Sequence, residues 1–212
     1  KNISVCSTHI RIGRRSIGYL AIAFGRYTDR KNNKPHFNLM SSIPFDLKSI
    51  RGFVFDVDGV ISHTVSAMDA EGQPMRTMNV KDGYAMQHAV KQGFLLAIIT
   101  GGYSPAIAKR AEYLGIKHVY MRSSNKMEQL EHLLQETGLK AEEIVYIGDD
   151  IPDLPVMQRV ALPVAPADAV PEIKQVAKYI SHCRGGEGVV RDVIEQTLKA
   201  QGRWAQGNGF GW

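Results

Sequence analysis

Short, fully apolar runs alternate with longer helical segments between about residues 50 and 200 of this chain. A strand that is apolar at every position is buried on both faces, and helices between such strands favour parallel pairing. We therefore predict an α/β fold, a doubly wound, Rossmann-like parallel sheet with helices on both faces. The expected strands are residues 52–55, 94–99, 118–121, 144–147 and 161–164, and the expected helices are residues 83–92, 105–114, 125–136, 154–160, 169–177 and 189–200.

One segment, residues 60–80, breaks this alternation. Two β-prone stretches flank a turn at Glu71-Gly72, a pattern typical of a β-hairpin. The hairpin is expected to project from the sheet, and its edges need a cover because unpaired strand edges bind other strands. We expect a second subunit to supply that cover.

The positive charge of the chain is concentrated in its first 40 residues. Residues 1–40 hold 8 of the 26 lysines and arginines and 1 of the 21 acidic residues, a net charge of +7. Residues 41–212 hold 18 basic and 20 acidic residues, a net charge of −2, so they form no basic platform for nucleic acid. Residues 1–40 can be a basic arm for nucleic acid, an Arg-rich transit peptide, or upstream or non-native sequence without a folded role. We expect the third, and hence a poorly ordered segment.

Cysteine content and hydropathy exclude further classes of protein. The two cysteines, Cys6 and Cys183, are too few for a disulfide scaffold or a Cys-rich zinc site, and they favour a reducing compartment such as the cytoplasm. No apolar run approaches the ~20 residues that a membrane span needs, so no membrane partner is expected. We predict one folded domain over residues 41–202, followed by a Gly- and aromatic-rich tail over residues 203–212 that is either floppy or covers a neighbouring subunit's site.

Polar residues follow the expected strands at the points where those strands end. In an open parallel sheet, ligands bind outside the carboxyl ends of the strands, so these residues are expected to meet at one edge. They are Asp56-Val-Asp-Gly59 after the first strand, Thr100-Gly-Gly102 after the second, Ser123-Ser-Asn-Lys126 after the third and Gly148-Asp-Asp-Ile-Pro-Asp153 after the fourth.

These residue types together predict phosphoryl transfer. Up to five carboxylates at one rim repel one another unless cations bind, and ligands that are all oxygen select a hard ion, Mg²⁺ above all. Lys126, the hydroxyl of Thr100 and the backbone N–H groups at Gly101-Gly102 are donors for phosphate oxygens. The five carboxylates belong to Asp56, Asp58, Asp149, Asp150 and Asp153.

Over about residues 50–200 this set of motifs resembles the four motifs of the haloacid dehalogenase phosphatase superfamily. The resemblance implies that Asp56 is the nucleophile that takes the phosphoryl group, and that Asp58 is the general acid and then the base. It also implies that Mg²⁺ is held by Asp56, the main-chain carbonyl of Asp58 and Asp149. Thr100, Gly101 and Lys126 are implied to hold the phosphoryl group, with Asp150 and Asp153 as supporting residues that orient Lys126 and a metal-bound water.

The spacing of the motifs resembles the capless subgroup of that superfamily, because neither gap between motifs has room for a cap domain. The resemblance implies a homotetramer with the hairpin and the C-terminal tail at subunit contacts. It further implies a phosphorylated 3-deoxy sugar acid as substrate, with a nine-carbon sugar-acid phosphate or another sugar phosphate as the alternative.

One position departs from the pattern of the superfamily members. After the Thr-Gly pair many members have a basic residue that can meet the sugar acid, whereas this chain has Gly102-Tyr103. Recognition of the substrate carboxylate then falls to other cations, for which the candidates are Arg76, Lys81 and Arg184.

Two other classes of function compete with a hydrolase. A phosphoacceptor signalling domain also gathers Asp, Thr and Lys on a parallel sheet. The order of motifs speaks against it, because Asp-x-Asp-Gly follows the first strand and the second acidic cluster follows the fourth. A nucleic-acid binder depends wholly on residues 1–40.

Overall fold

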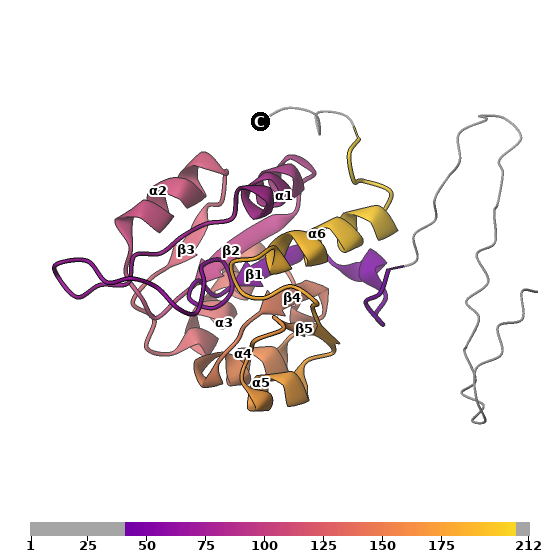
Figure 1. The fold of residues 1–212 in the computed structure, drawn as a ribbon. Coiled ribbons are helices and arrows are strands. Elements are labelled where there is room, and N and C mark those ends of the chain that lie inside the picture. Colours follow the sequence, from indigo (N-terminus) through magenta and orange to yellow (C-terminus); the bar gives the residue numbers. More distant parts are fainter. Residues whose placement is uncertain (1–40, 207–212) are drawn as a thin grey trace, which may run out of the picture. The chain divides into compact units, whose positions relative to one another are not determined.

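The computed structural model describes residues 41–206, and its sheet has the predicted doubly wound architecture (Figure 1). The predictions for residues 1–40 and for the last residues of the tail, 207–212, lie outside the described part of the chain. All six strands are parallel, in the order β3-β2-β1-β4-β5-β6. The strands are β1 (Gly52–Phe55), β2 (Leu95–Ile99), β3 (His118–Tyr120), β4 (Ile144–Ile147), β5 (Leu162–Ala165) and β6 (Tyr179–Ile180).

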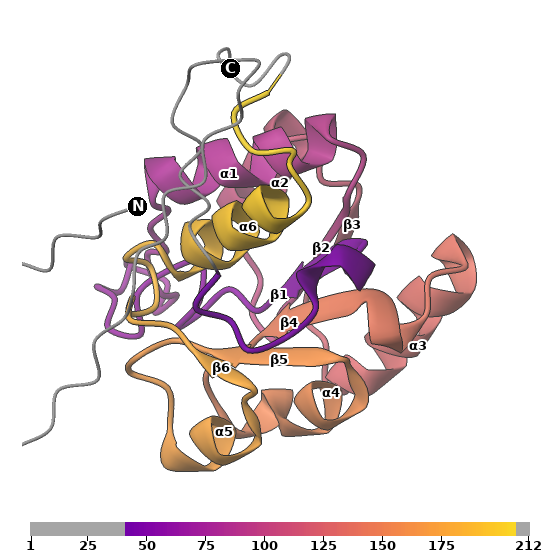
Figure 2. The same cartoon turned by 90° about the vertical axis from the view of Figure 1, so that its right-hand side faces the viewer.

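Helices cover both faces of this sheet, as predicted. Three helices pack on one face and three on the other, which the two views show as layers above and below the strands (Figures 1 and 2). The upper layer holds α1 (Val80–Lys91), α2 (Pro105–Tyr113) and α6 (Val189–Ala200), and the lower layer holds α3 (Lys126–Thr137), α4 (Leu154–Arg159) and α5 (Pro171–Val176). Short 3-10 helices lie at Leu47–Ser49, Ala141–Glu143 and Ile151–Asp153.

The apolar strands supply alternate residues to two separate cores. Phe53 and Phe55 of β1 lie in the core beneath α1, α2 and α6, whereas Val54 lies in the core against α3, α4 and α5. Each of these side chains is fully buried. An uninterrupted apolar run is therefore needed at β1, because successive side chains point to opposite faces and both faces are covered.

The predicted hairpin at residues 60–80 is present in a short form, with its backbone paired only near the turn. A single antiparallel bridge joins Met68 and Pro74, and the N–H of Met75 donates a hydrogen bond of 2.8 Å to the carbonyl of Ala67. A second ladder bond, of 2.9 Å, runs from the N–H of Asp69 to the carbonyl of Gln73. The hairpin is thus confirmed but is paired only next to its turn, because an isolated pair of strands is marginal in water. No cap domain interrupts the described residues, since the connection from Thr100 to Lys126 contains only α2 and β3. The strand β6, two residues long, was not predicted.

Within residues 41–206, no helix is both long enough and apolar enough to cross a membrane. Trp204, from the start of the predicted tail, packs on α1 of its own chain, with its ring edge-on to those of Tyr84 and His88. The guanidinium of Arg203 lies over the Phe94 ring and donates to the carbonyl of Gln92. The first residues after α6 are thus held against α1.

Asp82, in the first turn of α1, is fully buried at the contact with α6. Its Oδ1 accepts a hydrogen bond of 2.7 Å from the backbone N–H of Arg191, in the first turn of α6. Its Oδ2 has no hydrogen-bond partner among the described residues. Burial raises the pKa of Asp82 from 3.8 to about 6, against the lowering effect of Arg191. The ionised form of this side chain is therefore costly to the folded state.

Asp82→Asn is expected to make the stability of the protein less dependent on pH. Because the folded state binds the Asp82 proton more tightly than the unfolded chain, the stabilisation is complete below pH 3.8 and is lost as the pH rises through about 6. The free energy of unfolding of the variant, relative to wild type, should increase by about 2–3 kcal/mol between roughly pH 4 and pH 7.5. Urea unfolding at both pH values measures this difference. Glu172→Gln, at an exposed carboxylate, should show no such trend, and a pH-independent difference for Asp82→Asn would contradict the prediction.

Candidate active site

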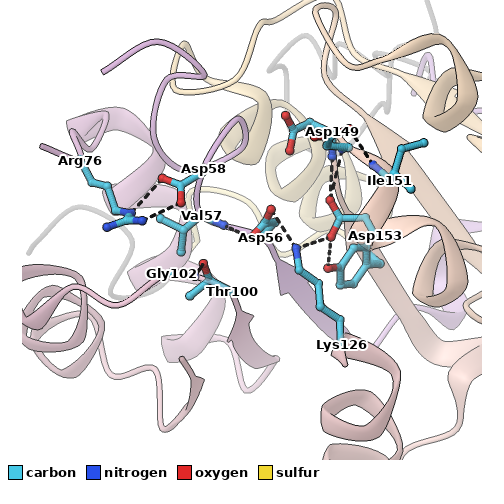
Figure 3. A network of polar contacts seen from close by, with 12 residues as sticks. Asp56, Val57, Asp58, Arg76, Thr100, Gly102, Lys126, Asp149, Ile151 and Asp153 are labelled. Carbon is cyan, nitrogen blue, oxygen red and sulfur yellow. Dashed lines mark hydrogen bonds and ion pairs between the residues drawn. The ribbon is translucent and has the colours of Figure 1, made fainter. Parts of the chain in front are cut away.

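The carboxyl ends of three neighbouring strands and the first turn of α3 meet at one edge of the sheet (Figure 3). Because β2, β1 and β4 are adjacent, the residues that directly follow them lie side by side. Asp56 follows β1, Thr100 follows β2 and Asp149 comes two residues after β4, while Lys126 is the first residue of α3. All four side chains are buried. The structure therefore brings together one predicted residue from each motif.

Lys126 lies between two carboxylates. Its Nζ is 2.9 Å from Oδ2 of Asp56 and 2.6 Å from Oδ1 of Asp153. The side chain of Asn125 caps α3 by accepting a hydrogen bond from the N–H of Met127, which makes Lys126 the first helical residue. An ammonium held between two carboxylates has little freedom, so Lys126 presents a fixed positive charge beside Asp56.

Asp153 uses both of its oxygens within the protein. Besides Lys126, its Oδ1 accepts a hydrogen bond of 2.5 Å from the hydroxyl of Tyr146, and its Oδ2 accepts 3.0 Å and 3.4 Å bonds from the N–H groups of Asp149 and Asp150. Asp153 thus orients Lys126 and the turn after β4. Sequence reasoning missed Tyr146, for which the only signal was one phenol in the otherwise apolar strand β4.

Asp149 has a buried oxygen with no partner. Its Oδ1 makes no hydrogen bond within the described residues, and one carboxylate oxygen each from Asp56, Asp149 and Asp153 lie within 4.8 Å of one another. Each oxygen of Asp153 has two partners, whereas those of Asp56 have one each, the N–H of Val57 on Oδ1 and Lys126 on Oδ2. Asp56 and Asp149 therefore have the most capacity left for a cation. Close carboxylate oxygens with an orphaned member are the donor set of a hard cation such as Mg²⁺.

Gly59 makes room for this arrangement. Its φ of +80° lies in the left-handed region, and a Cβ at this position would overlap the carboxylate of Asp149. The sharp turn after Asp58 and the approach of Asp149 to Asp56 both depend on the missing side chain.

Burial and mutual repulsion raise the pKa values of Asp56 and Asp149. Burial, followed by the charge of Asp153, raises the pKa of Asp56 to about 7 despite the nearby Lys126. Burial, followed by the charges of Asp56 and Asp153, raises the pKa of Asp149 to about 8. Burial alone would lower the pKa of Lys126, but the carboxylates of Asp56 and Asp153 raise it above its usual value. The site therefore has an excess of negative charge for a cation to neutralise.

Thr100 lies on the side of Asp56 that faces away from Asp153 (Figure 3). Its loop is fixed by backbone hydrogen bonds. Its Oγ1 accepts a 3.1 Å hydrogen bond from the N–H of Gly102, two residues on and just past Gly101. Its backbone N–H donates to the carbonyl of Tyr120, and its carbonyl accepts from the N–H of Ser123. The hydroxyl is buried at the edge that Asp56 and Lys126 share.

Asp58 is separated from the other carboxylates and pairs with Arg76. Nε and Nη2 of Arg76 each donate a 2.8 Å hydrogen bond to one oxygen of Asp58, a bidentate pair. In Figure 3 this pair lies on one side of Asp56, and Lys126 with Asp153 lies on the other. Asp56 therefore has a distinct chemical group on each side.

The remaining predicted residues lie at the margin of the site or away from it. Asp150 is exposed and caps the short helix that follows, its Oδ1 accepting a 2.8 Å hydrogen bond from Ile151 N–H. Arg184 is exposed and faces Asp168, with 3.5 Å between Nε and Oδ2. Lys81 lines a separate pocket of about 500 Å³, together with α6 side chains from Arg191 to Lys199. Of the three cations predicted to bind a carboxylate, the structure places Arg76 against another predicted site residue, Asp58.

Comparison with known proteins supports these observations. Residues 113–192 match the model of the family described as haloacid dehalogenase-like hydrolase. The 3-deoxy-D-manno-octulosonate 8-phosphate phosphatase of Salmonella typhi is 39% identical over 76% of this chain and 86% of its own. The crystal structure of the corresponding phosphatase from Yersinia pestis superposes with a TM-score of 0.72 at 38% identity, covering 74% of this chain and 85% of that one.

A further solved structure carries ligands. It is the 3-deoxy-D-manno-octulosonate 8-phosphate phosphatase of Moraxella catarrhalis in complex with a magnesium ion, a phosphate ion and a KDO molecule. It is 34% identical to this chain, with a TM-score of 0.71 over 74% of this chain and 90% of its own. These relatives are phosphatases, which overturns the alternative of a phosphoacceptor signalling domain. The sheet order, the four motifs and these similarities show that the chain belongs to the haloacid dehalogenase-like hydrolases and is a phosphatase.

Proposed function

We propose that this phosphatase uses Mg²⁺ to remove phosphate from 3-deoxy-D-manno-octulosonate 8-phosphate, or alternatively from KDN 9-phosphate or another sugar phosphate. The observation that carries the proposal is the pair of buried carboxylates, Asp56 and Asp149, the second with an unpartnered oxygen, beside a lysine held by Asp153. The curated relatives match most of this chain and are named as phosphatases of 3-deoxy-D-manno-octulosonate 8-phosphate, which supports this substrate.

In the proposed reaction, Asp56 attacks the phosphorus and forms an aspartyl-phosphate. An oxygen–phosphorus bond forms at Asp56 as the bond to the sugar oxygen breaks, and Asp58 gives its proton to that sugar oxygen. Asp58 then takes a proton from water, whose oxygen displaces Asp56 from the phosphorus and releases inorganic phosphate. Lys126 and Thr100 hold the phosphoryl oxygens throughout, with the N–H groups of the glycines after Thr100 as further donors.

Asp56, Asp149 and the main-chain carbonyl of Asp58 are the proposed metal ligands. Held by these groups, Mg²⁺ would supply positive charge against the phosphoryl oxygens and the two carboxylates. Asp153 has no free oxygen for this role, because Lys126 and Tyr146 contact one of its oxygens and two N–H groups contact the other.

A homotetramer in the cytoplasm is the proposed state of the enzyme. Val65, Met68 and Met75 in the segment between β1 and α1 are exposed by 89%, 70% and 56%. Exposed apolar side chains of this size favour a contact with another subunit. Light scattering of wild type and of a triple Ser variant at these positions tests the role of this segment in assembly, and an unchanged mass would contradict it.

Substrate comparison tests the proposed activity directly. Phosphate release with Mg²⁺ should give a higher kcat/KM for octulosonate 8-phosphate than for KDN 9-phosphate, because the similar curated proteins are named as phosphatases of the former. A higher value for the nine-carbon substrate would favour the alternative. A wild-type enzyme that releases no phosphate from any phosphomonoester would contradict the proposed function as a whole.

Binding of Mg²⁺ is expected to strengthen as the pH rises from about 6 to 8. The pKa values of Asp56 and Asp149, about 7 and about 8, mean that both groups carry protons at the lower pH, and a metal must displace them. Titration calorimetry at pH 7 in two buffers of different ionisation enthalpy should show release of about one proton per Mg²⁺. Asp149→Asn should reduce this release, and an affinity that is the same at both pH values would contradict the prediction.

A further inference from the structure

The guanidinium of Arg76 occupies the space that a side chain at residue 102 would fill. A Cβ built on Gly102 would overlap Nη2 of Arg76 and would lie 3.0 Å from its Cζ. Gly102 has no positive φ that would require glycine, so its backbone admits any residue. Glycine at residue 102 therefore leaves the space that the guanidinium of Arg76 occupies.

The loop at residues 100–103 is held in place, so it cannot move aside to relieve such an overlap. The N–H of Arg122 donates a 3.0 Å hydrogen bond to the carbonyl of Gly102, and the Arg122 guanidinium lies 4.1 Å from the centre of the Tyr103 ring. Arg122 adopts a φ of 55° at this point, a left-handed conformation that a non-glycine residue rarely takes. An added side chain at 102 would therefore displace the Arg76 side chain rather than the loop.

Arg76 still has donors for a ligand while it holds Asp58. Of its five N–H groups, two bind Asp58 and one, on Nη1, donates to the carbonyl of Tyr103 at 3.2 Å. Two N–H groups are left without a partner among the described residues, one on Nη1 and one on Nη2. A guanidinium with two free donors is suited to an anion of planar, bidentate shape.

The position of Arg76 also indicates which part of a substrate it meets. Lys126 lies beside Asp56 on the phosphoryl side, whereas Arg76 lies beyond Asp58 (Figure 3). In the proposed reaction Asp58 faces the leaving oxygen, so Arg76 faces the leaving group and not the phosphate. An anion bound there belongs to the alcohol portion of the substrate.

From this geometry we infer that Arg76 and Gly102 act as one specificity unit, in which the guanidinium seated over Gly102 binds the carboxylate of a sugar acid. The inference rests on the proposed function and adds the residue pair that selects a carboxylate-bearing leaving group. Arg76 takes the place of a basic side chain at residue 102, and its contact with Asp58 fixes the guanidinium next to the leaving oxygen.

The test compares octulosonate 8-phosphate with p-nitrophenyl phosphate, a phosphomonoester without a carboxylate. The measured quantity is the ratio of the two kcat/KM values. Arg76→Ser and Gly102→Ala should each lower this ratio by about 30-fold or more, the first by removing the guanidinium and the second by displacing it. Arg159→Ala, which removes an exposed arginine of α4 that pairs with Glu131 of α3, should leave the ratio unchanged.

A double variant makes the test sharper. Arg76→Ser combined with Gly102→Arg returns a cation to the same space, and it should recover the ratio to within about tenfold of wild type. Equal losses on both substrates in Arg76→Ser would overturn the inference, because Arg76 would then act only by holding Asp58. An unchanged ratio in Gly102→Ala would overturn it as well. If wild type cleaves p-nitrophenyl phosphate but shows no preference for the sugar-acid phosphate, this inference is contradicted, whereas the assignment as a phosphatase still stands.

Discussion

Asp56→Asn is expected to lower kcat for phosphate release by at least about a thousandfold, the largest loss from any single substitution in this chain. The amide keeps the shape of the carboxylate and can still accept the 2.7 Å hydrogen bond from the N–H of Val57. It cannot attack phosphorus, and it removes the negative charge that faces Lys126 at 2.9 Å. Initial rates with Mg²⁺ at pH 7.5 measure the effect.

The same variant separates catalysis from folding. Asp56 is buried and its pKa is about 7, so replacing it with a neutral isostere removes an unfavourable charge at higher pH. Thermal unfolding of Asp56→Asn should therefore stay within about 5 °C of wild type, since Lys126 keeps its contact with Asp153. Substantial residual turnover in a folded Asp56→Asn variant would contradict the role of this residue as the nucleophile.

Lys126→Met is expected to impair both activity and stability. The substitution leaves the buried carboxylates of Asp56, Asp149 and Asp153 without their shared cation, and an unpaired buried charge costs about 3–5 kcal/mol. We expect kcat to fall by about 100-fold or more, because the phosphoryl oxygens lose a fixed positive charge. Urea unfolding and steady-state kinetics measure the two effects.

The pH and metal dependence of Lys126→Met distinguishes this explanation from simple loss of packing. Because the pKa values of Asp56 and Asp149 are raised to about 7 and about 8, protons replace the missing cation at low pH. The destabilisation should therefore be smaller at pH 6 than at pH 8, and Mg²⁺ should reverse part of it at pH 8. Lys199→Met, at a helix-surface lysine paired with Glu195, should change neither property. A loss of stability independent of pH and Mg²⁺ would show that packing alone is responsible.

The architecture could be predicted because local and global signals agree. Runs such as those at β1 and β4 are apolar at every position, so burial on both faces follows from residue types alone. The strand β6 was missed because two residues at a sheet edge leave no periodic signal. The hairpin predicted within residues 60–80 is present, but it is paired only beside its turn, because β-propensity depends on neighbouring strands and this segment lies against none.

The candidate site could be predicted as a set of residues but not as a set of contacts. Motif order placed Asp56, Thr100, Lys126 and Asp149 at one edge, because the carboxyl ends of parallel strands meet there. Asp58 pairs with Arg76, and Asp153 pairs with Lys126. Which carboxylate pairs with which cation depends on the path of loops that are far apart in the sequence. The role of Gly102 likewise depends on the position of the Arg76 side chain, which is distant in the sequence.

The strand order has a consequence for synthesis of the chain. The central strand β1 pairs with β2 on one side and with β4 on the other, and β4 leaves the ribosome about 90 residues after β1. Until then β1, the strand that presents Asp56, has an open apolar edge that other chains can pair with. A nascent or truncated chain that lacks β4 is thus both without Asp149 and prone to aggregate. Completion of the acidic site and protection of the central strand occur in the same step.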